Sequence, residues 1–211
     1  MDSHLSKQRK GKMKYVIPYD FKQPKLFSKE ILRTISKIHD NIARGMSRIF
    51  SMSLNYKTDV TLHKIEQFSP SDFIKNMPTP CVVYTLTGRV MGGDIMITLP
   101  PEFCIHIIER ESGGLGVDLS YSRILTTIEE RIISRIQIQN EIIRAWEPLL
   151  KFNVENKLYE NKPENIHLGS VDPLLMAKMS IYLVEDIIEV GISYTYSFLK
   201  KALNDSINEL P

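Results

Sequence analysis

Apolar residues recur every three or four positions over two long stretches of the chain, a spacing that places them on one face of a helix. The first stretch follows Ser28, a good N-cap residue, and its stripe comprises Ile31, Leu32, Ile35, Ile38, Ile42, Met46 and Ile49. The second stripe comprises Ile128, Ile132, Ile133, Ile136, Ile142, Ile143 and Trp146. It starts with a capping-box pattern, Thr126 to Glu129, and stops before Pro148. The sequence therefore predicts two long helices, with Trp146 in the core.

Each predicted helix is followed by strand-like segments and a shorter helix. After the first helix we expect strands over 60–65, 81–86 and 94–99, with glycines 88, 92 and 93 in a turn, and a helix from Pro101. After the second we expect strands over 150–154, 174–184 and 190–196, and a helix over 198–203. The order of elements thus repeats after about 95 residues, which suggests an internal duplication. An accident of alternation is the alternative. Two such halves, about 28–112 and 125–207, would share one mostly antiparallel sheet covered by helices, an α/β fold with pseudo-twofold symmetry.

Composition is ordinary for a globular protein. The 211 residues carry a net charge of +2, which is too weak to indicate a nucleic-acid partner. The two cysteines lie in apolar stretches, and no apolar run approaches the roughly 18 residues of a membrane span. We expect buried, reduced thiols in a soluble, cytoplasmic protein. Basic residues cluster near the start of the chain in a segment with almost no apolar content, at Lys7, Arg9, Lys10, Lys12 and Lys14. We therefore expect residues 1–18 to be a flexible linker, although they would also suit an arm that binds acidic surfaces.

Motifs for catalysis and cofactor binding are missing from the sequence. It contains neither a phosphate-binding P-loop nor a dinucleotide-binding glycine pattern. Its five histidines show no metal spacing, and Cys104 and His106 would point to different faces of a helix. We therefore predict no catalytic residue, no cofactor and no metal.

Three of the ten glycines fall within residues 111–118, ESGGLGVD. A phosphate cradle needs glycines at the start of a helix, whereas these follow a helical pattern and so meet the carbonyl end. Gly113 or Gly114 suits a helix C-cap with positive φ. One glycine suffices for a cap, so the residues alone leave open whether the segment is a mobile surface loop or a docking loop.

Several blocks of sequence, in order, resemble the middle domain of the FliM family of flagellar motor switch proteins. The first block is residues 19–44, which include YDFKQPKLFSKE, LRT and IHDNIAR. The second is IIER followed by GGLG at 107–116, and the third is LTTIE at 125–129 with AWEP at 145–148. The resemblance implies that residues 19–211 form a three-layer α/β/α sandwich related to CheC, CheX and FliY.

The resemblance also implies a non-enzymatic role in the cytoplasmic rotor ring, or C-ring, at the inner face of the cell membrane, where it sets the direction of rotation. The family's glycine loop docks FliG, which assigns this role to Gly113, Gly114 and Gly116, with Glu109 and Arg110 beside them. We expect Gly114→Trp to abolish FliG binding without unfolding the domain. Neighbouring FliM subunits pack side by side in the family. The outward face of the first helix is a candidate for that contact or simply a solvated surface, and it comprises Lys29, Arg33, Lys37, Asp40 and Arg44.

The chain departs from the family at both ends. Residues 1–18 do not resemble the peptide that captures phosphorylated CheY, so this partner is not expected. The chain ends at Pro211 without the FliN-like domain, which leaves FliN contact in doubt and suggests an excised domain or a reduced homologue. The alternative function is a CheC-like phosphatase acting on phosphorylated CheY. Its E-x-x-N motif is absent, and the equivalent positions are Ser36 and His39, and Ser134 and Gln137.

Overall fold

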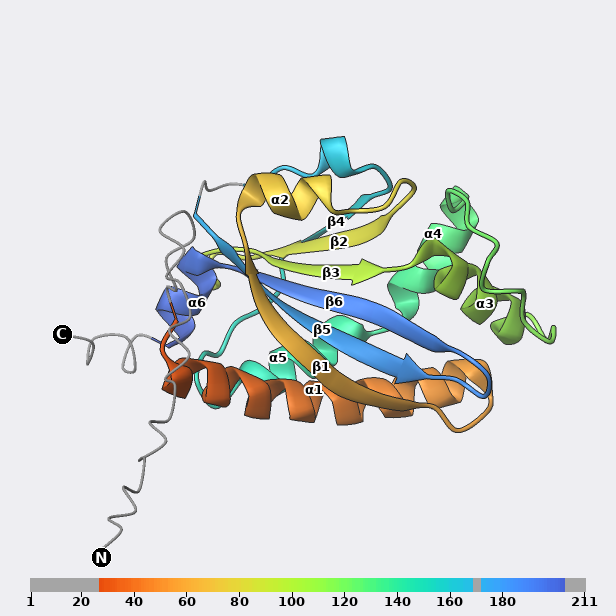
Figure 1. Cartoon of the computed structure of the whole chain (residues 1–211), viewed down its shortest axis with the longest axis horizontal. Helices are drawn as coiled ribbons and strands as arrows, with labels where there is room; N and C mark the ends of the chain where they lie inside the picture. The colour runs from red at the N-terminus through yellow and green to blue at the C-terminus, as the bar shows by residue number, and fades with distance from the viewer. Residues whose placement is uncertain (1–26, 169–171, 204–211) are drawn as a thin grey trace, which may run out of the picture.

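The computed structural model describes residues 27–168 and 172–203. It is a six-stranded sheet with helices on both faces and at both ends (Figure 1). The elements in chain order are α1 (Lys29–Leu54), β1 (Asp59–Phe68), α2 (Pro70–Lys75), β2 (Val82–Thr87), β3 (Ile95–Leu99), α3 (Pro101–Glu111), α4 (Thr127–Arg135), α5 (Ile138–Trp146), β4 (Asn156–Glu160), the 3₁₀ turn η1 (Pro163–Asn165), β5 (Leu174–Tyr182), β6 (Ile187–Thr195) and α6 (Tyr196–Ala202).

The sheet has the symmetry that an internal duplication requires. Its order is β1-β5-β6-β3-β2-β4, and every neighbouring pair is antiparallel. Exchanging β1 with β4, β2 with β5 and β3 with β6 gives the same order reversed. The predicted α/β fold with a pseudo-twofold repeat and an antiparallel sheet is therefore confirmed.

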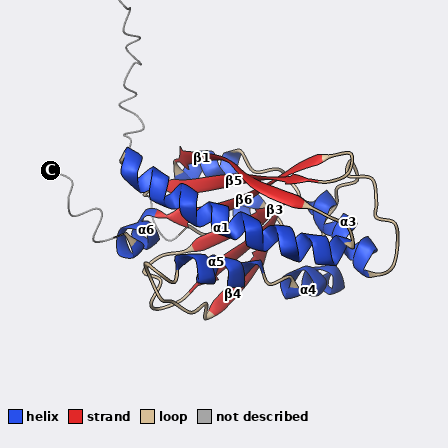
Figure 2. Ribbon diagram, turned by 90° about the horizontal axis from the view of Figure 1, so that it is seen from below, coloured by secondary structure: helices blue, strands red, loops and turns tan. Residues whose placement is uncertain are grey.

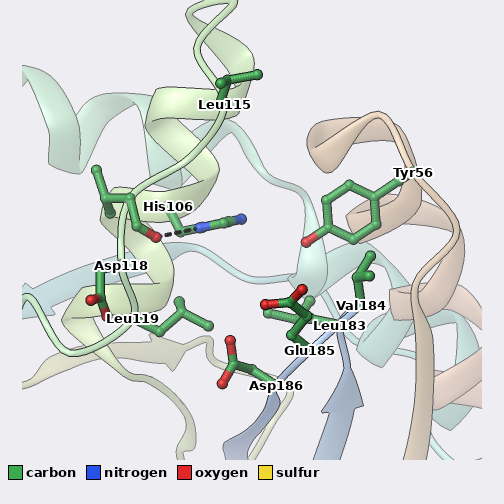
Figure 3. Close-up of a pocket in the computed structure, with 10 residues that line it drawn as sticks. Tyr56, His106, Leu115, Asp118, Leu119, Leu183, Val184, Glu185 and Asp186 are labelled. Atoms are coloured by element: carbon green, nitrogen blue, oxygen red, sulfur yellow. Dashed lines mark hydrogen bonds between the residues drawn. The ribbon is translucent and has the colours of Figure 1, made fainter.

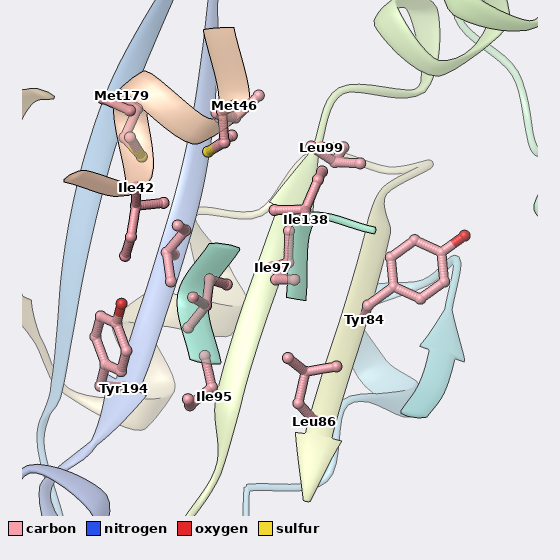
Figure 4. Close-up of a cluster of buried hydrophobic side chains, with 14 of the residues drawn as sticks. Ile42, Met46, Tyr84, Leu86, Ile95, Ile97, Leu99, Ile138, Met179 and Tyr194 are labelled. Atoms are coloured by element: carbon pink, nitrogen blue, oxygen red, sulfur yellow. The ribbon is translucent and has the colours of Figure 1, made fainter. Parts of the chain in front are cut away.

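The two faces of the sheet are covered unequally. Helices α1 and α5 lie side by side on one face, and α2 and η1 cover part of the other (Figures 1 and 2). Strand β2 serves both faces, because successive side chains of a strand point to opposite sides. Tyr84 and Leu86 join the large core beneath α1 and α5 (Figure 4), whereas Val83 joins a small core with Phe73 of α2. The result is a three-layer sandwich with one thick and one thin helical layer.

The second long helix of the sequence prediction is wrong in one respect, because it is two helices. The chain breaks at Ile136, whose ψ of 105° is extended, and resumes at Ile138. If the helix were unbroken, Gln139 and Asn140 would face the core, because they lie three and four residues after Ile136. The break instead buries Ile136 and Ile138 together, which leave only 7% and 3% of their surface exposed.

The predicted strand over 150–154 is also wrong, since β4 begins at Asn156. Pairing with β2 starts where the Glu155 amide donates to the Thr87 carbonyl at 2.9 Å. Residues before Glu155 run past the end of β2 and have no strand to pair with. Phe152 is buried there for a different reason, which is edge-to-face packing on Phe198 at 5.6 Å. The remaining predicted strands and helices are present with shifted ends, and α2 was not predicted.

A chain of hydrogen bonds crosses the large core. The Trp146 indole donates to the Tyr194 oxygen at 3.2 Å, and the Tyr194 hydroxyl lies 3.0 Å from Nε2 of His39. Nδ1 of His39 lies 2.8 Å from the Ile35 carbonyl, which can only accept, so the ring must donate there. A neutral ring then accepts at Nε2, and every donor has a partner. All three side chains are fully buried, and burial lowers the pKa of His39 to about 4.

Both cysteines are free and buried, as predicted, and burial raises the pKa of Cys81 to about 11. Among the described helices, none combines the length and the apolar character needed to cross a bilayer. The basic segment 1–18 and the part of the resemblance before Phe27 lie outside the described residues, as does the end of the second half, 204–207.

Candidate functional site

The segment ESGGLGVD begins at the carboxyl end of α3, as the sequence predicts. The amide of Gly114 donates to the Glu109 carbonyl at 2.9 Å, and the amide of Gly113 donates to the Arg110 carbonyl at 3.1 Å. These nested bonds form a Schellman motif, in which the residue after the C-cap has positive φ. Gly113 holds that position with φ of 87°. The helix end therefore presents carbonyl groups, and a phosphate cradle is excluded here.

The other two glycines also have local reasons to be glycine. A Cβ at Gly114 would lie 2.5 Å from Oε2 of Glu109 and 3.0 Å from its carbonyl oxygen. Gly116 has φ of 91°, and a Cβ there would lie 2.4 Å from the His106 ring. Close packing therefore explains the two glycines, Gly114 and Gly116, that a cap at Gly113 leaves unexplained. A tryptophan at 114 would disturb the cap itself, so this exchange is not a clean test of docking.

Arg110 fastens this loop to the end of α1. Its Nε donates to the Leu54 carbonyl at 2.8 Å, and Nη1 donates to the Gly114 carbonyl at 3.3 Å. Its guanidinium also lies 5.5 Å from the centre of the Tyr56 ring. A cation among carbonyls that end two helices is electrostatically favourable. Arg110 therefore has a structural role in the domain, whereas the neighbouring Glu109 is exposed.

Leu115 stands at the tip of the loop, and the sequence reasoning did not single it out. Its side chain is 91% exposed and projects away from the helix (Figure 3). An apolar residue between two constrained glycines gains nothing from burial in this domain. The sequence signal was present in GGLG, where the only side chain belongs to leucine. Leu115 is therefore available for an apolar contact with another molecule.

The candidate face of α1 is exposed along its length. Lys29, Arg33, Lys37, Asp40 and Arg44 all lie on the solvent side, three or four residues apart. Arg44 donates to the Asn41 side chain. Within the described residues, Lys29, Arg33 and Lys37 take part in no ion pair. The structure thus brings these residues into one basic stripe, at a distance from the glycine loop along α1 (Figure 1).

The side chains at the positions that would carry a CheC-like motif form hydrogen bonds within the chain. The Ser36 hydroxyl donates to the Leu32 carbonyl, and His39 is fully buried against Tyr194. Ser134 donates to the Arg131 carbonyl, and the Gln137 side chain accepts from Asn140. Neither a glutamate nor an asparagine stands at any of these four positions, so the carboxylate and amide of that motif are missing. Within the described ranges there is also no cluster of three potential metal ligands.

Comparison with known proteins identifies relatives of this fold and sequence. The model of a family described as flagellar motor switch protein FliM matches residues 28–200. FliM of Bacillus subtilis is 29% identical over 166 residues, which cover 77% of this chain and 50% of that protein. FliM of Thermotoga maritima is 28% identical over 194 residues, covering 90% of this chain and 58% of that protein. The chain spans about half the length of the curated relatives it matches.

Solved structures share the fold. FliM in a FliG–FliM complex from H. pylori superposes with a TM-score of 0.74 at 23% identity, covering 82% of this chain and all of that one. The FliM middle domain from H. pylori gives 0.71 at 20% identity, covering 87% of this chain and all of that one. FliY of Thermotoga maritima gives 0.73 at 12% identity, covering 88% and 100%. At these identities the structures report on the fold alone.

Proposed function

The chain belongs to the FliM family, and we propose that it serves as a structural and interaction domain of the flagellar motor switch. The observation that carries this proposal is the match of the family model to residues 28–200, nearly all of the described chain. In this role the domain is part of the cytoplasmic C-ring, at the inner face of the cell membrane, and its position sets the direction of rotation. It is not an enzyme, and it uses no cofactor.

The glycine loop is the proposed docking site for FliG. A FliM protein that has been solved with FliG shares this fold, which makes the same partner reasonable here. Gly113, Gly114 and Gly116 shape the loop through positive φ and close packing, and Arg110 anchors it to α1. Glu109 and Leu115 are both exposed and available for contact. In this proposal the glycines build the loop, and the leucine between them makes the apolar contact.

Packing between neighbouring subunits is the second proposed contact. The side chains of the basic stripe on α1 (Lys29, Arg33, Lys37, Asp40 and Arg44) are exposed, and in the described part of the chain they form no ion pair. In this proposal they meet an acidic surface of the next subunit. Exposed ion pairs contribute little affinity singly, but a stripe of them sets orientation. FliN contact and the lack of CheY capture remain predictions of the sequence alone.

Binding of the purified chain to FliG, measured by calorimetry, tests the docking proposal. We expect Leu115→Asp to weaken binding at least tenfold, because a charge would replace the exposed apolar contact. Its effect on folding should stay within about 0.5 kcal/mol, as for other surface substitutions. Val90→Asp is the matched control, since Val90 is 48% exposed in the β2–β3 turn at the opposite end of the sheet (Figure 1). Equal binding by both variants would refute the loop as the docking site.

A further inference from the structure

A groove opens beside the glycine loop, between segments that are distant in sequence. One wall is the stretch after Gly114, and the opposite wall is the tip of the β5–β6 hairpin, with Tyr56 between them (Figure 3). The space within it is about 490 Å³. Leu115 and Val184 stand on the two walls, with 91% and 80% of their surfaces exposed. An open groove with apolar side chains on both walls is typical of a surface that another molecule covers.

The charged side chains that line the groove are all acidic, and the Tyr56 hydroxyl is a donor among its polar groups. Asp118, Glu185 and Asp186 line it, and none of the ion pairs in the described part of the chain involves them. Arg110, the nearby cation, is turned toward Leu54 and Gly114. The groove therefore carries a negative charge that this domain does not balance.

His106 adds a further acceptor. Its Nδ1 lies 2.8 Å from the Val117 carbonyl and must donate there, so a neutral ring presents a lone pair at Nε2. That nitrogen is buried without a hydrogen-bond partner, and Figure 3 shows it on the groove side of the ring, facing Tyr56. A buried acceptor without a partner is costly for the domain.

We propose that this groove receives an arginine or lysine side chain carried on an apolar segment of FliG. The inference rests on the proposed function, because the wall that bears Leu115 is the docking loop itself. A cation with several N–H donors matches a groove lined by carboxylates, and apolar neighbours would cover Leu115 and Val184. The β5–β6 hairpin thereby becomes a second element of the docking surface. The other source of a cation is the basic stripe of a second copy of this chain, which lies toward the opposite end of α1.

The test compares two variants that lose the same charge. In Glu185→Gln with Asp186→Asn the groove loses two carboxylates. In Glu147→Gln with Glu164→Gln two exposed carboxylates are lost elsewhere. Binding to FliG is measured by calorimetry at low and high salt, and self-association is measured by sedimentation. We expect the groove variant to bind at least tenfold more weakly at low salt, and its affinity to depend less on salt than that of the wild type. The control should stay within twofold.

The outcomes separate the two proposals. If the groove variant binds like the control while Leu115→Asp still weakens binding, the groove inference is wrong and the docking loop stands. If the groove variant changes self-association and leaves FliG binding intact, the cation comes from a second copy, which also overturns the inference. If the wild-type chain does not bind FliG at all, both proposals fail. Hydrogen exchange of β5 and β6 confirms that the hairpin of each variant is folded.

Discussion

Helix α1 and the pair α4–α5 occupy equivalent places in the two halves of the repeat, yet they are held in different ways. Ten of the 26 residues of α1 are buried, along its entire length. In α4 only Ile133 of nine residues is buried, and Ile128 is 73% exposed. The break at Ile136 turns α5 toward the core and α4 away from it. The break at Ile136 has thus divided this helical layer into α5, which is held by apolar burial, and α4, which is not.

Polar contacts replace the missing burial of α4. Thr126 and Glu129 form the capping box, and Arg123 holds both oxygens of Glu129, at 2.7 and 2.6 Å. This pairing lowers the pKa of Glu129 to about 2. Lys157 donates to the Ser134 carbonyl at the other end of the helix. Such contacts hold a helix in place but stabilise it less than apolar burial does. We therefore expect α4 to unfold locally before α1 and α5 do.

The largest expected effect comes from the layer shared by α1 and α5. Trp146→Ala removes a fully buried ring that contacts Tyr194 and Phe198 edge-on at 5.3 and 5.2 Å. We expect a loss of about 3–5 kcal/mol in the free energy of unfolding, measured by urea denaturation. Ile128→Ala in α4 is the control, and it should cost less than about 0.5 kcal/mol because the side chain is exposed. Similar losses for both would contradict the division of the layer.

The next effect is a dependence on pH that involves α1 and α5 together. His39 has a pKa of about 4 in the folded protein and about 6.5 when unfolded, so the unfolded chain binds the proton first. The stability is fully present above pH 6.5 and is lost as the pH falls toward 4, by on the order of 3 kcal/mol. Protonation would place a donor on Nε2, where the Tyr194 hydroxyl already donates.

The contribution of His39 can be isolated with a variant. His39→Gln cannot titrate, so its free energy of unfolding should change less between pH 7 and pH 5 than that of the wild type, although the variant is less stable throughout. Both proteins keep Glu129, whose own contribution is lost only at lower pH. Parallel curves for the two proteins would assign the acid sensitivity to other groups.

Local patterns predicted those parts of the fold that depend on neighbours in sequence. The stripe of α1, the capping box of α4 and the cap at Gly113 follow from spacing and residue type, and the structure confirms them. Helix α2 was missed although Ser69 caps it and Pro70 opens it, which is a typical start signal of a helix. The break at Ile136 was missed because apolar residues recur at helical spacing on both sides of it, so the two helices look like one stripe.

The candidate site was predictable only in its loop. The position of residues 113–116 after a helix follows from the sequence, whereas the packing of Gly116 on His106 depends on how the chain folds back. The second wall of the groove, residues 183–186, lies about 70 residues further along the chain. The antiparallel pairing of β6 with β3, and of β5 with β1, brings that hairpin beside the end of α3 (Figure 1). Long-range pairing of this kind has no local signature, so no single motif could reveal the groove.

The smallest expected effect tests whether polar contacts hold α4 in place. Thr126→Ala deletes the hydroxyl that accepts from the Glu129 amide at 3.3 Å, and loss of an N-cap costs about 1 kcal/mol. Since α4 buries so little, this loss should appear mainly as faster hydrogen exchange of the α4 amides. Exchange in α1 should hardly change. Ser28→Ala removes the equivalent cap of α1, where the ten buried residues should hold the helix together and confine faster exchange to its first turn. If the two variants loosen their helices to the same extent, burial does not distinguish the two layers, and the capping box is not what keeps α4 in place.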